Sequence, residues 1–183
     1  GSRYIAAHAH LRWLLGRELH RAPEAVRFVR GEHGKPALED GPEHFKVHFN
    51  LSHSGAMGLV GLSRGGALGV DIEGERVRDF AGLARRFFAP QEQAWLLEQP
   101  PAQQAHAFAR LWTCKEAWMK ADGRGLAVLR QPLATLQGTA QLHAGGRAWW
   151  VRELETETCY AAAVVLEQEP EAVSVRKLTL PLR

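Results

Sequence analysis

Helical spacing of apolar residues, together with capping and breaking residues, marks helices at the start and in the middle of the chain. Asp79 can cap one helix, and Pro90 stands where the next would begin. The pair Pro100-Pro101 ends that helix, and Gly123 stands just past the end of a longer one. The pattern predicts helices over residues 4–20, 79–88, 91–99 and 102–122.

Alternation of apolar and polar residues predicts strands on both sides of the helical middle. It is clearest over residues 45–51, where apolar positions alternate with Lys46, His48 and Asn50. Residues 63–66 predict a hairpin turn between two strands, and Gly145-Gly146 predicts another. The strands are expected over residues 26–30, 45–51, 57–62, 67–73, 135–142, 147–154, 159–166 and 173–180.

Strands and helices are segregated along the chain rather than strictly alternating. This arrangement favours an α+β fold over a doubly wound parallel sheet. Because two groups of strands flank the helical middle, we expect two halves, residues 1–66 and 67–183, that form one functional unit.

Composition is that of a globular protein and excludes several classes. Of the 183 residues, 45% are hydrophobic and 23% charged, so wholesale disorder is not expected. The net charge of +3 suits an anionic ligand or an acidic partner, but is too small by itself to indicate nucleic acid. The two cysteines, Cys114 and Cys159, have no metal or redox spacing, and no signal peptide or membrane-spanning run occurs. We therefore expect a soluble, cytoplasmic protein.

Asp71 and Glu73 form the first candidate site. Side chains two residues apart on a strand share one face, so both carboxylates point the same way, while Val70 and Ile72 face the core. The pair requires a cation, a shared proton or full solvation. An isolated pair of this kind is more often a solvated edge-strand face, but apolar neighbours favour a Mg²⁺ site that also meets a phosphate.

Trp112, Glu116 and Lys120 lie one helical turn apart on one face of the long predicted helix. In isolation, Glu116 and Lys120 would usually be a surface ion pair. The helix is strongly apolar around them, which favours a functional role instead. Glu116 can act as a third oxygen ligand or a general base, and Lys120 can neutralise charge on a phosphate.

Weaker signals come from two loops. Ser52 and His53 stand where a strand is expected to enter a turn, and both can donate to phosphate, although a strand-end histidine is more often an ordinary surface side chain. Lys35 and Pro36 form a stiffened loop that presents one cation. The chain contains no recognisable zinc, P-loop, dinucleotide-binding or nucleophile-elbow motif.

Four motifs occur in a fixed order: Gly34-Lys35-Pro36, Asn50-x-Ser52-His53-Ser54, Gly69-Val-Asp71-Ile-Glu73 and Trp112-x-x-Lys115-Glu116-x-x-x-Lys120-x-x-Gly123-x-Gly125-Leu126. This ordered set resembles the 4′-phosphopantetheinyl transferases of the Sfp type. The resemblance runs from about Arg12 to the C-terminus. It implies a pseudo-twofold monomer of two similar α+β halves, with coenzyme A bound in the cleft between them.

The resemblance also implies a reaction. A serine hydroxyl of an acidic acyl or peptidyl carrier protein attacks the β-phosphate of coenzyme A, phosphopantetheine moves to the serine, and 3′,5′-ADP leaves. Enzymes of this type serve fatty acid, polyketide or peptide synthases, and the sequence does not say which. Relatives carry tens of residues before the first helix, so we expect this chain to lack the first strand segment of the N-terminal half.

Roles are carried over to matching positions. Asp71, Glu73 and Glu116 would bind Mg²⁺, or Mn²⁺ in its place. Glu116 and Lys120 would be catalytic, with Glu116 as the base, and Glu92 matches another acidic position considered as a base. The positions expected to bind coenzyme A are Arg12, Lys35, Pro36, Ser52, His53, Asp71 and Lys120.

Two other classes of function remain open from the residues. One is a non-catalytic binder of anionic nucleotides or acidic carrier proteins. The other is a nucleic-acid module, for which no aromatic and basic stacking platform is visible. Docking of an acidic carrier is expected on a basic and aromatic run, for which a plain solvated helix face is an equal alternative: Arg76, Arg78, Arg85, Arg86, Phe87 and Phe88.

Overall fold

A computed structural model describes residues 2–31, 34–39, 47–74, 79–133, 139–156 and 159–177. Its helices are α1 (Ser2–Glu18), α3 (Phe80–Phe87), α4 (Pro90–Glu98) and α5 (Gln104–Asp122), with short 3-10 turns at Pro23–Ala25, Pro101–Gln103 and Gly125–Val128. Its strands are β1 (Phe28–Arg30), β2 (Pro36–Leu38), β3 (His48–Ser54), β4 (Met57–Ser63), β5 (Leu68–Gly74), β6 (Thr139–Ala144), β7 (Arg147–Leu154) and β8 (Tyr160–Leu166).

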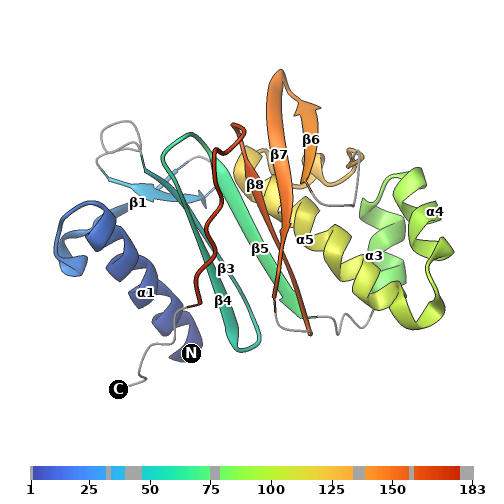
Figure 1. The fold of residues 1–183 in the computed structure, drawn as a ribbon, viewed down its shortest axis with the longest axis horizontal. Coiled ribbons are helices and arrows are strands. Elements are labelled where there is room, and N and C mark those ends of the chain that lie inside the picture. The colour runs from blue at the N-terminus through green and yellow to red at the C-terminus, as the bar shows by residue number, and fades with distance from the viewer. Residues whose placement is uncertain are drawn as a thin grey trace.

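The strands form antiparallel pairs rather than a parallel sheet, and the fold is α+β as predicted. β1 pairs with β2, β3 pairs with β4, and a four-stranded sheet has the order β5-β8-β7-β6. Helix α5 lies across one face of that sheet, and α3 and α4 pack near the N-terminal end of α5 (Figure 1). The long helix therefore faces the strand that carries Asp71 and Glu73.

The helix boundaries follow from the residues that predicted them. Asp79 accepts a hydrogen bond from the Gly82 amide at 2.9 Å and caps α3, while Pro90 occupies the first turn of α4. Gly123 ends α5 in the left-handed region, with φ of +81°. These three signals were read correctly because each acts within one turn of the chain.

One of the two predicted hairpin turns is confirmed. Gly145 and Gly146 have φ of +61° and +76° and join β6 to β7, with Ala144 opposite Arg147. The turn predicted over residues 63–66 does not join a hairpin. β4 instead pairs back onto β3, and β5 pairs with β8, almost a hundred residues further along the chain. The pairing of β5 with β8 joins segments far apart in the sequence, so local turn residues do not predict it.

Other strand predictions differ at their ends. β3 continues through Ser52 and His53 to Ser54, so these residues lie in the strand rather than in the turn that follows it. The strand expected over 173–180 is wrong in its described part, since residues 173–177 are not a strand and Val175 is 58% exposed. The start of the strand predicted over 45–51, the start of that over 135–142 and the end of that over 173–180 lie outside the described residues.

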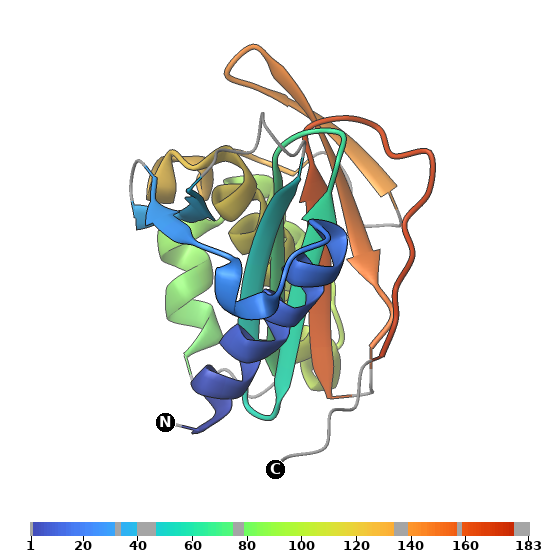
Figure 2. The ribbon, with the colours of Figure 1, turned by 90° about the vertical axis from the view of Figure 1, so that its left-hand side faces the viewer.

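Buried apolar residues gather in separate clusters. Leu11 and Leu15 pack with Val26, Val47 and Phe49. Helix α1, which carries the two leucines, lies against the β3–β4 hairpin (Figure 2). A larger cluster surrounds α5 and includes Phe108, Trp118 and Trp149. A small one, built on Leu68, Val70 and Val164, lies where the hairpin meets β5. The division into halves at residue 66 stays a prediction.

A glycine brings β5 directly against α5. A Cβ atom on Gly69 would lie 2.0 Å from the Ala117 carbonyl oxygen and 2.4 Å from the Ala121 nitrogen. No side chain fits in that space, so only glycine allows the two backbones to come so close. Asp71 and Glu73, which follow on the same strand, are thereby held next to α5.

Among the described residues, no helix has both the length and the apolar character needed to span a membrane.

Candidate functional site

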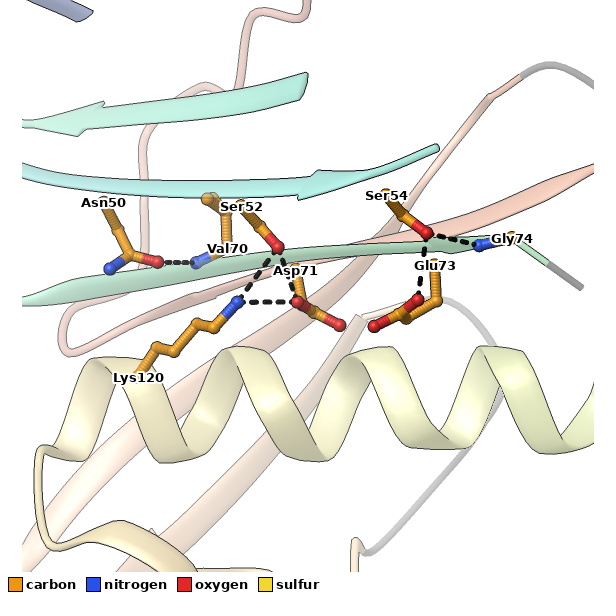
Figure 3. A network of polar contacts seen from close by, with 8 residues as sticks. All are labelled: Asn50, Ser52, Ser54, Val70, Asp71, Glu73, Gly74 and Lys120. Carbon is orange, nitrogen blue, oxygen red and sulfur yellow. Dashed lines mark hydrogen bonds and ion pairs between the residues drawn. The ribbon is translucent and has the colours of Figure 1, made fainter. Parts of the chain in front are cut away.

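The polar residues of three predicted motifs meet between β5 and α5, with β3 along the other side of β5 (Figure 3). Asp71 and Glu73 come from β5, Ser52 and Ser54 from β3, and Lys120 from α5. Chain segments up to 68 residues apart are therefore joined at one site. The solvated edge face considered for Asp71 is excluded, because Asp71 is only 2% exposed.

Asp71, Ser52 and Lys120 form a closed triangle. The Lys120 ammonium donates to Asp71 Oδ1 at 2.7 Å and to Ser52 Oγ at 3.0 Å, and Ser52 Oγ donates to Asp71 Oδ1 at 2.7 Å. Ser52 is itself buried, so this hydroxyl lies inside the carboxylate site. Within the described residues, Lys120 forms its ion pair with Asp71 rather than with Glu116, and the helix ion pair considered from the sequence is not formed.

Glu73 is held by Ser54. The hydroxyl of Ser54 donates to Glu73 Oε2 at 3.0 Å and accepts the Gly74 amide at 3.1 Å. Burial, and then the negative charge of Asp71, raise the pKa of Glu73, while the Ser54 hydrogen bond and the charge of Lys120 act in the opposite direction. Ser54 was not singled out by sequence reasoning as a site residue.

Glu116 faces the same carboxylates from α5. Burial, followed by the charge of Asp71, raises the pKa of Glu116 to about 7; Lys120 lowers it, and Glu73 adds a smaller increase. A carboxyl group with this pKa can accept a proton near neutral pH, as a general base must. The three acidic residues predicted together are thus close enough to act on one another.

These residues fit a divalent cation in their chemistry. Within the described residues, Asp71 Oδ2 is buried without a hydrogen-bond partner, and burial followed by the charge of Asp71 raises the pKa of Glu73 and of Glu116. Hard cations such as Mg²⁺ prefer such oxygen ligands. In the described part of the chain, no three His, Cys, Asp or Glu side chains already stand close enough together to hold a metal. Binding would therefore require these carboxylates to move closer.

A pocket of about 220 Å³ lies beside the β1–β2 loop and the start of β3. Lys35 and Pro36 line it together with His48 and Phe49. The Lys35 ammonium does not point freely into the pocket: it donates to the carbonyl oxygens of Leu68 and Lys120. Lys35 therefore ties the N-terminal part of the chain to the beginning of β5 and the end of α5.

The basic residues predicted for the coenzyme phosphates lie on α1 and β3. Arg12 donates to the carbonyl oxygen of Val26, and its guanidinium lies 4.8 Å from the centre of the Phe28 ring. His53 is exposed. Burial, followed by the charges of Arg12 and His53, lowers the pKa of His8, which places these three side chains near one another. His8 was not singled out from the sequence, although it precedes Arg12 by one helical turn.

Glu92 lies elsewhere and is fully engaged. One of its oxygens accepts the Ala89 amide at 2.7 Å and lies 2.8 Å from the Lys115 ammonium, and the other accepts the Leu133 amide at 2.8 Å. Lys115 has no exposed surface and also donates to the carbonyl oxygens of Leu129 and Gln131. The alternative of Glu92 as a base does not fit this arrangement, because the carboxylate is only 3% exposed.

The basic and aromatic run is divided between surface and core. Arg85 and Arg86 are exposed in the last turn of α3. Phe88, by contrast, is buried and stacks on Phe108 at 5.1 Å. The prediction that Phe88 forms part of a docking surface is therefore wrong. Trp112 also stacks on Phe108, at 5.6 Å, and so helps to anchor α5 in the core. Arg76 and Arg78 lie outside the described residues.

Comparison with known proteins gives a consistent answer. The family model of the 4′-phosphopantetheinyl transferase superfamily matches residues 67–168. The chain is 38% identical over 167 residues to 4′-phosphopantetheinyl transferase HetI of Nostoc sp., which covers 89% of this chain and 70% of that relative.

Two more relatives agree. The putative 4′-phosphopantetheinyl transferase slr0495 of Synechocystis sp. is 40% identical over 126 residues, 68% of this chain and 51% of the relative. The transferase Sfp of Bacillus subtilis is 31% identical over 137 residues, 75% of this chain and 57% of the relative. The chain thus spans about half the length of several curated relatives that it matches. With the motifs gathered at one site, these matches show that the chain belongs to the 4′-phosphopantetheinyl transferase superfamily.

Proposed function

We propose that this chain transfers 4′-phosphopantetheine from coenzyme A to a serine of an apo acyl or peptidyl carrier protein, with release of 3′,5′-ADP. The observation that carries the proposal is the meeting of Asp71, Glu73, Glu116 and Lys120 between β5 and α5, in a chain of this superfamily. The relatives that match it are named as 4′-phosphopantetheinyl transferases.

In the proposed reaction, the serine oxygen bonds to the β-phosphorus of coenzyme A, and the bond from that phosphorus to the oxygen bridging the two phosphates breaks. Glu116, which lies near Asp71 and Glu73, takes the serine proton as the general base. Lys120 turns from Asp71 and Ser52 towards the phosphate and offsets the negative charge that collects on its oxygens.

Asp71, Glu73 and Glu116 are the residues that would hold Mg²⁺, or Mn²⁺ in its place. A bound cation would neutralise the pyrophosphate so that an oxygen nucleophile can approach it. The unpartnered Asp71 Oδ2 supports this assignment, because a buried carboxylate oxygen with no partner is costly without a cation.

For coenzyme A, the pocket that includes Pro36 and His48 suits an adenine ring, since its lining is mainly apolar. Arg12 is the cation proposed to meet its phosphates, with His53 and His8 beside it as hydrogen-bond donors. Ser52 contributes through Asp71 and Lys120 rather than as a separate phosphate donor.

The test is a mass measurement on several apo carrier proteins after incubation with this chain, coenzyme A and Mg²⁺. We expect a gain of one phosphopantetheine arm on the carrier serine, and none when that serine is alanine. No gain on any carrier would refute the transferase proposal. Retained binding of coenzyme A without transfer would favour the non-catalytic binder. Binding of nucleic acid that does not depend on Mg²⁺ would favour a nucleic-acid module.

The carrier is proposed to dock by charge on Arg85 and Arg86, which are exposed at the end of α3. Charge reversal of both residues (Arg85→Glu with Arg86→Glu) is expected to raise the KM for an acidic carrier several-fold and to leave the KM for coenzyme A unchanged. An unchanged KM for the carrier rules this surface out. The monomeric state and the cytoplasmic location are proposed with the function, and gel filtration tests the first.

A further inference from the structure

The side of β5 opposite β8 is joined to β3 by side chains. Main-chain pairing joins β5 to β8, residue by residue from Leu68–Leu166 to Gly74–Tyr160. On the β3 side, Asn50 Oδ1 accepts the Val70 amide at 2.9 Å, and Ser54 Oγ accepts the Gly74 amide at 3.1 Å. Every second residue of β3, from Asn50 through Ser52 to Ser54, therefore reaches β5 (Figure 3).

The direction of the two Ser54 hydrogen bonds follows from the single hydrogen of its hydroxyl group. A hydroxyl has one hydrogen to donate and can accept as well. Ser54 accepts from the Gly74 amide, so its single hydrogen is left for Glu73 Oε2. A side chain that bonds the main chain of β5 and the Glu73 carboxylate together fixes the direction of that carboxylate relative to the strand.

Asn50 differs from Ser54 although both lie on the same face of β3. Asn50 accepts a main-chain amide and, within the described residues, forms no hydrogen bond to a carboxylate. Ser54 serves both the strand and the acidic site. The two residues thus separate the effect of holding β5 against β3 from the effect of aiming a metal ligand.

From this geometry we infer that Ser54 is a positioning residue that orients Glu73 as a ligand for the divalent cation. The inference rests on the proposed function, because that function requires the cation. Groups that hold a metal ligand from behind typically change metal affinity about 10- to 100-fold when they are removed. Ser54 lies in the N-terminal part of the chain, so this part helps to build a site whose proposed ligands all come from residues 71–116.

The experiment measures Mn²⁺ binding by electron paramagnetic resonance, without substrate or carrier. Ser54→Ala is expected to weaken Mn²⁺ binding about 10-fold, whereas Ser54→Thr, which keeps a hydroxyl on the strand, stays close to the starting chain. Asn50→Ala is the matched control. It should lower the free energy of unfolding and leave Mn²⁺ affinity unchanged.

The outcomes separate the two levels of the argument. If the starting chain and Ser54→Ala bind Mn²⁺ equally, the positioning role is wrong while the proposed function stands. If Asn50→Ala weakens Mn²⁺ binding as much as Ser54→Ala does, the effect comes from strand spacing, and the positioning role is also wrong. If the starting chain binds no Mn²⁺, the inference fails with the metal part of the proposed function. Phosphopantetheine transfer, measured separately by mass, then shows whether the reaction survives.

Discussion

Helix α5 presents two lysines to two acidic residues, and the two pairs differ in every other respect. Lys115 and Glu92 are 0% and 3% exposed, and each bonds to its partner and to main-chain groups. Lys120 is 27% exposed at its side chain, and in the described part of the chain its partner Asp71 keeps one buried oxygen without a hydrogen bond. The first pair is fully satisfied, and the second is not.

This difference separates a structural pair from a functional one. The Lys115–Glu92 pair ties the start of α4, the middle of α5 and residues 129–133 together, and no polar atom of it is left for a ligand. The Asp71–Lys120 pair sits among carboxylates with raised pKa values. Carboxylates with perturbed pKa values cluster at functional sites, where a ligand can supply the missing compensation.

The largest effect is expected from breaking the satisfied pair. Lys115→Met leaves Glu92 buried without its cation, and should lower the free energy of unfolding by about 3–5 kcal/mol. Urea denaturation measures this loss. Adding Glu92→Gln to Lys115→Met removes the remaining buried charge and should recover part of it. If the double variant is less stable than Lys115→Met, the pair is not the reason for the loss.

Breaking the unsatisfied pair should act on rate more than on stability. Lys120→Met is expected to reduce the transfer rate about 10²- to 10³-fold, because the cation beside the phosphate is lost. Stability should fall by about 1–3 kcal/mol, since Asp71 loses a charged hydrogen bond but retains that of Ser52. Steady-state kinetics and urea denaturation give the two numbers. A rate loss no larger than that of Lys115→Met, measured under folded conditions, would contradict the comparison.

A change that moves β5 away from α5 should disturb the Asp71–Lys120 pair without altering either residue. In Gly69→Ala, a Cβ would meet the Ala117 carbonyl oxygen at 2.0 Å, so the strand or the helix must shift. We expect a loss of about 1–3 kcal/mol in the free energy of unfolding, together with weaker Mn²⁺ binding. Gly58→Ala is the control, because its Cβ would have only ordinary contacts at 3.9 Å and beyond. Equal behaviour of both variants would argue against a spacing role for Gly69.

The sequence predicted the local parts of this arrangement well. Asp79, Pro90 and Gly123 set helix ends through bonds within one turn, and the spacing of Glu116 and Lys120 placed both on α5. The distinction between the two lysine pairs was not predictable in the same way. Lys115 and Lys120 are both lysines of one helix, and the packing of α4 and of residues 129–133 helps to bury the first.

The β3 contacts show a second limit. Alternation in the Asn50-x-Ser52-x-Ser54 run could have indicated three polar side chains on one strand face. The sequence analysis expected a turn at Ser52 instead, so it did not extend the strand to Ser54. The hairpin predicted at 63–66 also placed β5 beside β4, where the structure pairs it with β8. Non-local strand pairing depends on burial of whole faces, which a single local turn does not report.

A further effect concerns the pH dependence of stability in the absence of divalent ions. Glu116 has its pKa raised from 4.5 to about 7 by burial and by Asp71, so between these values the folded chain holds a proton that the unfolded chain has released. This contribution therefore favours folding at low pH and is lost as pH rises from about 4.5 through about 7. Glu116→Gln should flatten that part of the stability curve, and Mg²⁺ should offset the loss in the starting chain alone. Urea denaturation at several pH values in EDTA measures the difference, and parallel curves for the two chains would show that Glu116 does not carry the uncompensated charge.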